Sequence, residues 1–340
     1  MDNSTEFEFS DYTQRVIVAT LLVVVSVAGI IGNSMVLVAV LLSKTLHTTT
    51  IAFMVNLGTA HLMTCLVLPW DVVALLGKDG LPVAEWICSV TTVIISITIG
   101  CGIYTLAFIG LNHLLMITRP ATTFRRMFTP KKMAVWLVVT WLIPFLVIVV
   151  PPAINVGEVG FSEKYHLCGS KSSSSSFQTY NFIRVLGLYP IPLVCIVVCY
   201  VLIWIHVHRQ ANELFRPRDS DIFMVEKSGT GSIQPRSLST FPDITSQSVM
   251  ITKTMSLVVC GFVLFLTPYS IILFIGSTEQ AVPYATAILF ASTCINPIIY
   301  GIRHSDFKTV FGCLLRCRWR DIPQPSAFLK ATREIKCCGQ

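Results

Sequence analysis

The longest uncharged stretch of the chain constrains its fold more than any other feature. From Ser89 to Ile117 the sequence contains no Asp, Glu, Lys or Arg. Roughly 20 apolar residues in a helix cross about 30 Å of hydrocarbon, so this stretch can span a membrane with tilt and overhang. Cys88 offers a thiol at one end. The triplet Asn112-His113-Leu114, followed by Arg119-Pro120, is expected to place polar groups at the water boundary at the other end.

Further apolar blocks flank this stretch on both sides. The chain is 53% hydrophobic and 13% charged, whereas typical soluble domains contain about 25% charged residues. Continuous apolar runs lack the alternation of a barrel strand, and helices satisfy their own backbone groups in lipid. We therefore predict an all-α membrane protein, a seven-transmembrane helix bundle over residues 16–302. The expected spans are 16–42, 51–76, 87–117, 133–157, 180–206, 250–278 and 280–302.

Charge and polarity predict the segments outside the bundle and its orientation. Residues 1–15 form a short acidic tail that is expected to be disordered, and residues 207–250 form a flexible third cytoplasmic loop. The loop 119–132 and the segment 303–340 carry many Lys and Arg residues close to the membrane. The positive-inside rule then places the N-terminus outside the cell and the C-terminus in the cytoplasm of a multi-pass plasma-membrane protein.

Composition and motifs argue against several classes of function. The net charge of +7 comes from basic residues beside apolar blocks, without interleaved aromatic residues, so no nucleic-acid partner is expected. Most of the 12 cysteines lie inside the apolar blocks, and no Cys/His cluster has metal-site spacing, so we expect no metal or cofactor. An enzyme is not expected, because no nucleophile–base pair or phosphate loop is visible. A transporter stays an alternative, disfavoured because no internal repeat is found.

Marker residues follow one another in order along the apolar blocks. They are Gly32-Asn33, Asn56-Leu57, Cys88, Trp141, Pro151-Pro152, Cys168, Pro192, Tyr200, Phe262, Pro268-Tyr269, Asn296-Pro297-Ile298-Ile299-Tyr300 and Asp306-Phe307-Lys308. Together they resemble the rhodopsin-like (class A) G-protein-coupled receptors, from about Gly32 to Phe311. The resemblance implies a cell-surface receptor that carries an extracellular ligand signal to heterotrimeric G proteins, with arrestin and a receptor kinase as further partners.

The resemblance also assigns roles to residues of this chain. It implies a Cys88–Cys168 disulfide between the third helix and the second outer loop, and a short amphipathic eighth helix in the segment 303–340. A polar network is expected inside the bundle from Asn33, His61 and Asn296. The residues expected to act in G-protein coupling and activation are Asn112, His113, Tyr200, Lys253, Asn296, Pro297 and Tyr300, with Phe262, Leu266 and Pro268 as the activation hinge.

The chain departs from the family pattern in the parts that signal. Asn112-His113-Leu114 stands where the family carries Asp-Arg-Tyr, and histidine has at most two donors where arginine has five. His61 replaces the aspartate of a sodium site, and Leu266 replaces a tryptophan. One interpretation is a divergent receptor that still couples to G proteins. The other is an atypical scavenger or arrestin-biased receptor, and proton sensing by His61 and His113 is a further hypothesis.

Residues in the outer half of the bundle indicate the class of ligand. Ile95 stands where aminergic receptors carry an aspartate, and Phe290 where opsins carry the retinal-binding lysine, so neither ligand is expected. Ionisable residues at membrane depth are costly unless they are paired or face water. Arg184 could bind a carboxylate or phosphate, or pair with an acid such as Glu279. The ligand-binding candidates are Asp71, Ile95, Arg184, Tyr269 and Phe290, for a peptide, lipid or acidic small molecule.

Two kinds of covalent modification are predicted from short motifs. Asn3-Ser4-Thr5 is a glycosylation sequon. Cys313 and Cys317 lie among Arg316, Arg318 and Arg320 after the expected eighth helix, where palmitoylation would attach the segment to membrane lipid.

Overall fold

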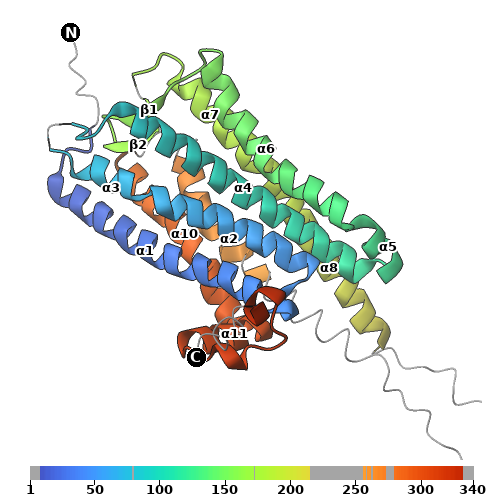
Figure 1. Ribbon diagram of the computed structural model, residues 1–340. Helices are drawn as coiled ribbons and strands as arrows, with labels where there is room; N and C mark the ends of the chain where they lie inside the picture. Colours follow the sequence, from blue (N-terminus) through green and yellow to red (C-terminus); the bar gives the residue numbers. More distant parts are fainter. Residues whose placement is uncertain are drawn as a thin grey trace, which may run out of the picture.

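The molecule is an elongated bundle of long helices with a small β hairpin at one end and helix α11 at the other (Figure 1). The computed structural model describes residues 8–331, except 79, 172, 215–255, 258, 262 and 273–278. We call the two ends of the bundle the hairpin end and the α11 end. The helices are α1 (Tyr12–Leu42), α2 (Thr49–Val67), α3 (Pro69–Leu76), α4 (Glu85–Thr118), α5 (Ala121–Met127), α6 (Pro130–Ala153), α7 (Phe177–Leu188), α8 (Pro190–Leu214), α10 (Val282–Arg303) and α11 (Ser305–Leu315), with short 3-10 helices at Lys44–Leu46, Glu279–Ala281 and Trp319–Asp321.

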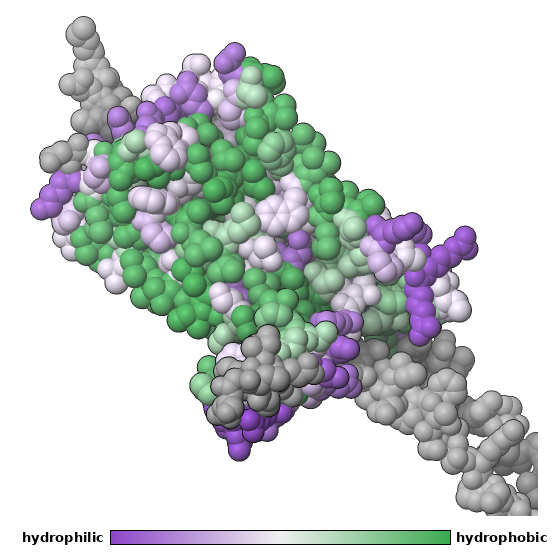
Figure 2. All heavy atoms as spheres, viewed as in Figure 1, coloured by the Kyte–Doolittle hydropathy of each residue, from purple (hydrophilic) through white to green (hydrophobic). Residues whose placement is uncertain are grey.

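Six helical spans in the described part of the chain are long and apolar enough to cross a membrane. Helices α2 and α3 form one of them, broken at Pro69, and α7 and α8 form another, broken at Pro190. The shorter apolar helix Val259–Ile272 completes the predicted seven-helix bundle. Figure 2 shows a broad apolar surface over the bundle, with hydrophilic side chains gathered at its two ends.

Several spans differ from their predicted limits at one end. Helix α1 begins at Tyr12 rather than at 16, because the Asp11 carboxylate caps it by accepting from the amides of Thr13 (2.8 Å) and Gln14 (3.4 Å). Helix α6 starts at Pro130, a favoured first-turn proline, and ends at Ala153 rather than at 157. The fifth span starts at Phe177 and continues to Leu214.

Helix α4, the longest uncharged stretch of the sequence, is the centre of the bundle. It packs against α2, α6 and α8, and it also contacts both strands of the hairpin. Helix α4 ends at Thr118, close to the predicted limit, and neighbouring helices cover Asn112 and His113, which are each 0% exposed. The position of Asn112-His113-Leu114 at the water boundary stays a prediction.

The hairpin covers one end of α4 and is covalently joined to it. Strands β1 (Val159–Ser162) and β2 (Leu167–Ser170) are antiparallel. A disulfide connects Cys88 to Cys168, which confirms the implied pair. Closing a loop of this length stabilises a fold by about 4 kcal/mol in the chain-entropy model. Lys171, after β2, forms a hydrogen-bonded ion pair with Glu85 and lies near Glu158. The hydrogen bond to Glu85 and the two negative charges raise the pKa of Lys171.

Residues 8–11, which we call the N-terminal strap, lie across the hairpin end. The Phe9 amide donates to the Lys164 carbonyl (2.9 Å), and the Glu8 carboxylate lies 2.9 Å from Nε2 of His166. Phe9 is 3% exposed and contacts the Tyr284 ring edge to face, with centroids 6.1 Å apart. The prediction of a disordered tail is therefore wrong for the described residues 8–15, because an aromatic side chain in this segment is buried on the bundle.

The segment after α11 returns to the end of α1. The amphipathic helix α11 buries Phe307 and Val310 and exposes Lys308, as expected of the eighth helix. Residues 322–329, which we call the tail clasp, then bond to the chain around Ser43. The Lys44 amide donates to the Gln324 carbonyl (2.9 Å), and the Ser326 amide donates to the Leu42 carbonyl (2.9 Å). No motif in the sequence indicates this contact.

Candidate functional site

A cavity opens between the helices at the hairpin end. Its volume is about 130 Å³, which is room for a small organic molecule rather than for water alone. Most of its wall is apolar, with a few polar groups that converge from different helices, as in typical small-molecule sites. The wall includes all five ligand-binding candidates predicted from the sequence: Asp71, Ile95, Arg184, Tyr269 and Phe290.

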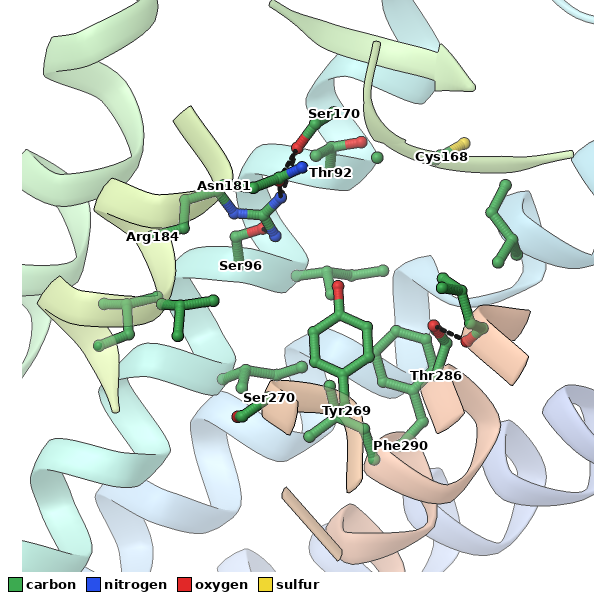
Figure 3. A pocket seen from close by; sticks show the side chains of 18 of the residues that line it. Thr92, Ser96, Cys168, Ser170, Asn181, Arg184, Tyr269, Ser270, Thr286 and Phe290 are labelled. Carbon is green, nitrogen blue, oxygen red and sulfur yellow. Dashed lines mark hydrogen bonds between the residues drawn. The ribbon is translucent and has the colours of Figure 1, made fainter. Parts of the chain in front are cut away.

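Arg184 is the principal cation of the cavity. Its Nη1 donates to Oγ of Ser170 (2.6 Å) and, at 3.4 Å, to Oδ1 of Asn181, and its Nη2 donates to Oγ of Ser96 (3.2 Å). Figure 3 shows these side chains gathered on one side of the cavity, across from Tyr269 and Phe290. Within the described residues every one of these partners is uncharged, and the buried Nε has no hydrogen-bond partner. The guanidinium therefore keeps donor capacity for a ligand.

Asp71 lies on another part of the wall, in the first turn of α3. Its side chain is only 2% exposed, and its Oδ1 accepts from the Cys168 amide (2.9 Å). This bond connects α3 to the strand that carries the disulfide.

Residues of the sixth span form a further side of the cavity. Leu266, Tyr269 and Ser270 all line it, and Leu266 is 5% exposed. Thr267, on the same helix, shares a hydrogen bond of 2.8 Å with the hydroxyl of Tyr189, between α7 and α8. Pro268 lies among these residues, half-buried. A molecule in the cavity would therefore touch the helix that carries the predicted hinge.

Two sets of polar side chains connect five helices of the bundle. Nδ2 of Asn296 lies 3.4 Å from Nδ1 of His61, and Nδ2 of Asn33 donates to the Thr293 carbonyl (3.1 Å). The structure thus places the predicted network members on facing helices α1, α2 and α10. A second set joins α2, α4 and α6, because Asn56 accepts from Nε1 of Trp141 (2.9 Å) and donates to Oγ1 of Thr105 (2.8 Å).

The residues predicted for coupling lie toward the α11 end. Asn112 donates to Oγ1 of Thr50 (2.9 Å), whereas both ring nitrogens of His113 are buried without a partner among the described residues. Tyr300 stacks on Phe307 with centroids 5.6 Å apart, and Tyr200 packs against the same apolar cluster. Pro297 is buried within α10 against Gly32 of α1. Their role in coupling stays a prediction.

Some predicted residues lie elsewhere or outside the described part of the chain. Lys253, Phe262 and Asn3 are outside it, and the side chain of Glu279 is not described, so the suggested Arg184–Glu279 pair is not tested. Cys317 is exposed, but Cys313 is buried against the bundle, so the palmitoylation prediction now favours Cys317. Reasoning from sequence missed Ser96, Ser170 and Asn181, since isolated Ser and Asn residues carry no distinguishing signal.

Comparisons with known proteins decide the family. A family model described as 7 transmembrane receptor (rhodopsin family) matches residues 32–300 of this chain. The chain belongs to the rhodopsin family of seven-transmembrane receptors.

Curated relatives of this rhodopsin-family receptor include type-1 angiotensin II receptors. The human protein is 25% identical over 316 residues, covering 88% of this chain and 81% of that receptor. The Meriones unguiculatus protein is 26% identical with the same coverage. The crystal structure of squid rhodopsin, 20% identical, has a TM-score of 0.71 and covers 92% of this chain and 89% of that chain, which shows a shared fold. The chain is thus a multi-pass membrane receptor and not an enzyme.

Proposed function

We propose that the chain is a plasma-membrane receptor that binds an extracellular ligand at the hairpin end and signals to heterotrimeric G proteins at the α11 end. The charge distribution supports this orientation, because Arg125, Arg126, Arg316 and Arg320 flank the spans at the α11 end. The Cys88–Cys168 disulfide at the opposite end is of a kind that persists outside the cell.

The cavity is the observation that carries this proposal. It is lined by Leu266 and Tyr269, on either side of Pro268 in the sixth span. A proline within a helix removes a backbone hydrogen bond and permits a kink. A ligand that contacts these residues better in one position of the helix than in another shifts the population between the two positions. Movement of the sixth span would then open the α11 end for a G protein.

The ligand proposed for this cavity carries an anionic group. Arg184 supports this, because its hydrogen-bond partners among the described residues are neutral and its guanidinium can bind carboxylate or phosphate oxygens. The angiotensin II receptors among the relatives make angiotensin II a first ligand to test. Ile95 and Phe290 line the same cavity and offer neither an amine-binding carboxylate nor a retinal-binding lysine.

The first experiment measures whether the receptor couples without a known ligand. Basal nucleotide exchange is measured on a panel of purified G proteins with wild type, His113→Arg and His113→Gln at matched surface expression. We expect wild type to drive exchange on at least one G protein. His113→Gln controls for loss of the imidazole without a gain of charge.

A different outcome favours the alternative receptor class. If exchange requires His113→Arg, the bundle is intact but histidine at this position has weakened coupling, and a scavenger or arrestin-biased receptor is the better description. Arrestin recruitment by wild type after receptor-kinase treatment then separates those two. Ion or solute flux through reconstituted vesicles would instead support the transporter alternative.

A further inference from the structure

One acidic and one basic side chain line the cavity from different helices. Asp71 comes from α3 and Arg184 from α7, and both line the same space (Figure 3 shows the Arg184 side). No ion pair joins them, and neither has an oppositely charged partner among the described residues. The cavity therefore has a negative and a positive site that do not neutralise each other by contact.

Each of these charges has unused hydrogen-bonding capacity. A carboxylate accepts about four hydrogen bonds, and among the described residues Asp71 accepts one, from the Cys168 amide. Arg184 has five N–H donors, and its buried Nε has no hydrogen-bond partner in the described part of the chain. Charged groups removed from water are costly unless they are paired and fully bonded. Both side chains therefore keep hydrogen-bonding capacity that a ligand in the cavity could use.

We infer that the ligand is bipolar, with a cationic group bound by Asp71 and an anionic group bound by Arg184. This inference rests on the proposed function, since it deepens the description of the same site. The body of the ligand contacts the apolar wall, which includes Ile95, Ile99, Leu266 and Phe290. An amino group and a carboxylate on one apolar chain have this chemistry.

Charge complementarity makes the cationic group of the ligand, as well as its anionic group, a determinant of specificity. A purely anionic ligand would satisfy Arg184 but leave the carboxylate of Asp71 exposed to a like charge. A purely cationic ligand would bind Asp71 but leave the guanidinium of Arg184 exposed to a like charge. A bipolar ligand satisfies both sites and keeps the occupied cavity neutral, so each single-charge analogue is disfavoured by an uncompensated buried charge.

A purely structural role for Asp71 is the competing explanation. Its contact with the Cys168 amide fixes the hairpin to α3 and needs only an acceptor. Asp71→Asn keeps a carbonyl oxygen for that contact and removes the negative charge. This variant therefore separates fixation of the hairpin from attraction of a cation, and its thermal stability without ligand reports whether the hairpin is intact.

The test uses the full-length receptor in lipid nanodiscs and a series of ω-amino acids from aminobutanoic to aminodecanoic acid. Matched carboxylic acids and alkylamines are the single-charge controls. Binding is measured as an increase in thermal stability with concentration, for wild type, Asp71→Asn and Arg184→Gln. Wild type is expected to bind one length of amino acid about tenfold or more tightly than the matching acid, the ratio for one lost charged hydrogen bond.

The variants make the result specific to the two residues. Asp71→Asn is expected to lose the preference for the amino acid and still bind the carboxylic acid, whereas Arg184→Gln is expected to lose binding of both. Equal binding of amino acid and acid by wild type overturns the inference, and so does an unchanged preference in Asp71→Asn. Failure of every probe to bind also overturns it. The basal exchange assay needs no ligand, so it reports failure of the proposed function separately.

Discussion

At the scale of residues, small side chains decide where the helices of this bundle can meet. Gly100 of α4 lies where the helix crosses α6. A Cβ at this position would be 2.7 Å from Cβ and 2.9 Å from Cγ of Pro144, and 3.1 Å from Cδ2 of Leu188. A proline ring cannot rotate away as a flexible side chain can. Helices α4 and α6 can therefore pack this closely only because residue 100 has no side chain.

Gly100→Ala is therefore expected to destabilise the receptor by about 1–3 kcal/mol, the usual range for overpacking. Thermal unfolding of the purified protein measures the change. Gly312→Ala in α11 is the matched control, because nothing lies within 4 Å of its added Cβ and alanine favours a helix by roughly 0.5–1 kcal/mol. Equal melting temperatures for the two variants would contradict the prediction.

His304 between α10 and α11 gives the receptor a pH-dependent term in its stability. Burial lowers the pKa of His304, and the charge of Asp306 opposes this only in part. Protonation is then easier in the unfolded chain than in the folded one, so stability falls as the pH falls below about 6.5, the ordinary histidine value. The contribution is fully present at higher pH.

Unfolding of wild type and His304→Gln as a function of pH tests this assignment. The difference in unfolding free energy between wild type and His304→Gln is expected to be constant above about pH 7.5. Below about pH 6.5 wild type is expected to lose stability relative to the variant, as the linkage relation requires. Subtracting the variant removes the contribution of the other histidines. A difference that does not change with pH would show that His304 is not responsible.

At the scale of elements, the hairpin and the N-terminal strap together cover the mouth of the bundle. Phe9 belongs to an apolar cluster that also contains Ile95, Leu167 and Phe290, three residues of the cavity wall. The strap is attached to the hairpin through Lys164 and His166. Order in the strap and order around the cavity are thus expected to be linked.

Phe9→Ala tests that link between the strap and the cavity. Loss of a buried phenylalanine costs about 3–5 kcal/mol in a rigid core, and here we expect the loss to open the strap locally rather than unfold the bundle. Hydrogen exchange should become faster in residues 8–15 and in the hairpin. Val24→Ala, a change at a residue exposed on α1 (61%), should leave both rates unchanged. Unaltered exchange in Phe9→Ala would show that the strap does not support the hairpin.

At the scale of the whole molecule, the tail clasp connects the end of the chain to the end of its first helix. Oγ of Ser326 donates to the Leu41 carbonyl (2.6 Å), and Oγ of Ser43 donates to the Pro323 carbonyl (2.7 Å). Ile322 and Leu329 are buried at 3% and 5% exposure. Apolar burial and backbone pairing together hold this segment beside the surface proposed for G-protein coupling.

A negative charge at Ser326 should release the tail clasp. In Ser326→Asp the hydroxyl donor is lost and a carboxylate is placed against the Leu41 carbonyl, an unfavourable contact of two acceptors. We expect trypsin to cleave Arg318, Arg320 and Lys330 several-fold faster than in wild type, since exposed backbone is the preferred substrate. Thr309→Ala on the exposed face of α11 is the control. Unchanged cleavage in Ser326→Asp would mean that Ser326 does not hold the segment.

Some features of this receptor were predictable because they depend on periodicity or composition along the chain. Uncharged runs such as Ser89–Ile117 must be helical in lipid, since only regular structure satisfies the backbone there. The disulfide, the eighth helix and the family were inferred from markers in fixed order. The structure contains the disulfide and the helix, and the family model matches the chain. Asp71 and Arg184 are predicted from their charge and depth, and Ile95, Tyr269 and Phe290 from their places in the family pattern. The structure places all five around one cavity.

Tertiary structure alone decided the contacts that join distant parts of the chain. The packing of helices around α4 buries Asn112 and His113, which the sequence alone does not indicate. Ser96, Ser170 and Asn181 surround Arg184, and the strap and the clasp cover the two ends, although none of these residues stands out in the sequence. The apolar pattern determines that a segment crosses the membrane, because hydration and backbone bonding act locally. Which side chains then meet depends on helix breaks, such as those at Pro69 and Pro190, and on packing between residues far apart in the chain.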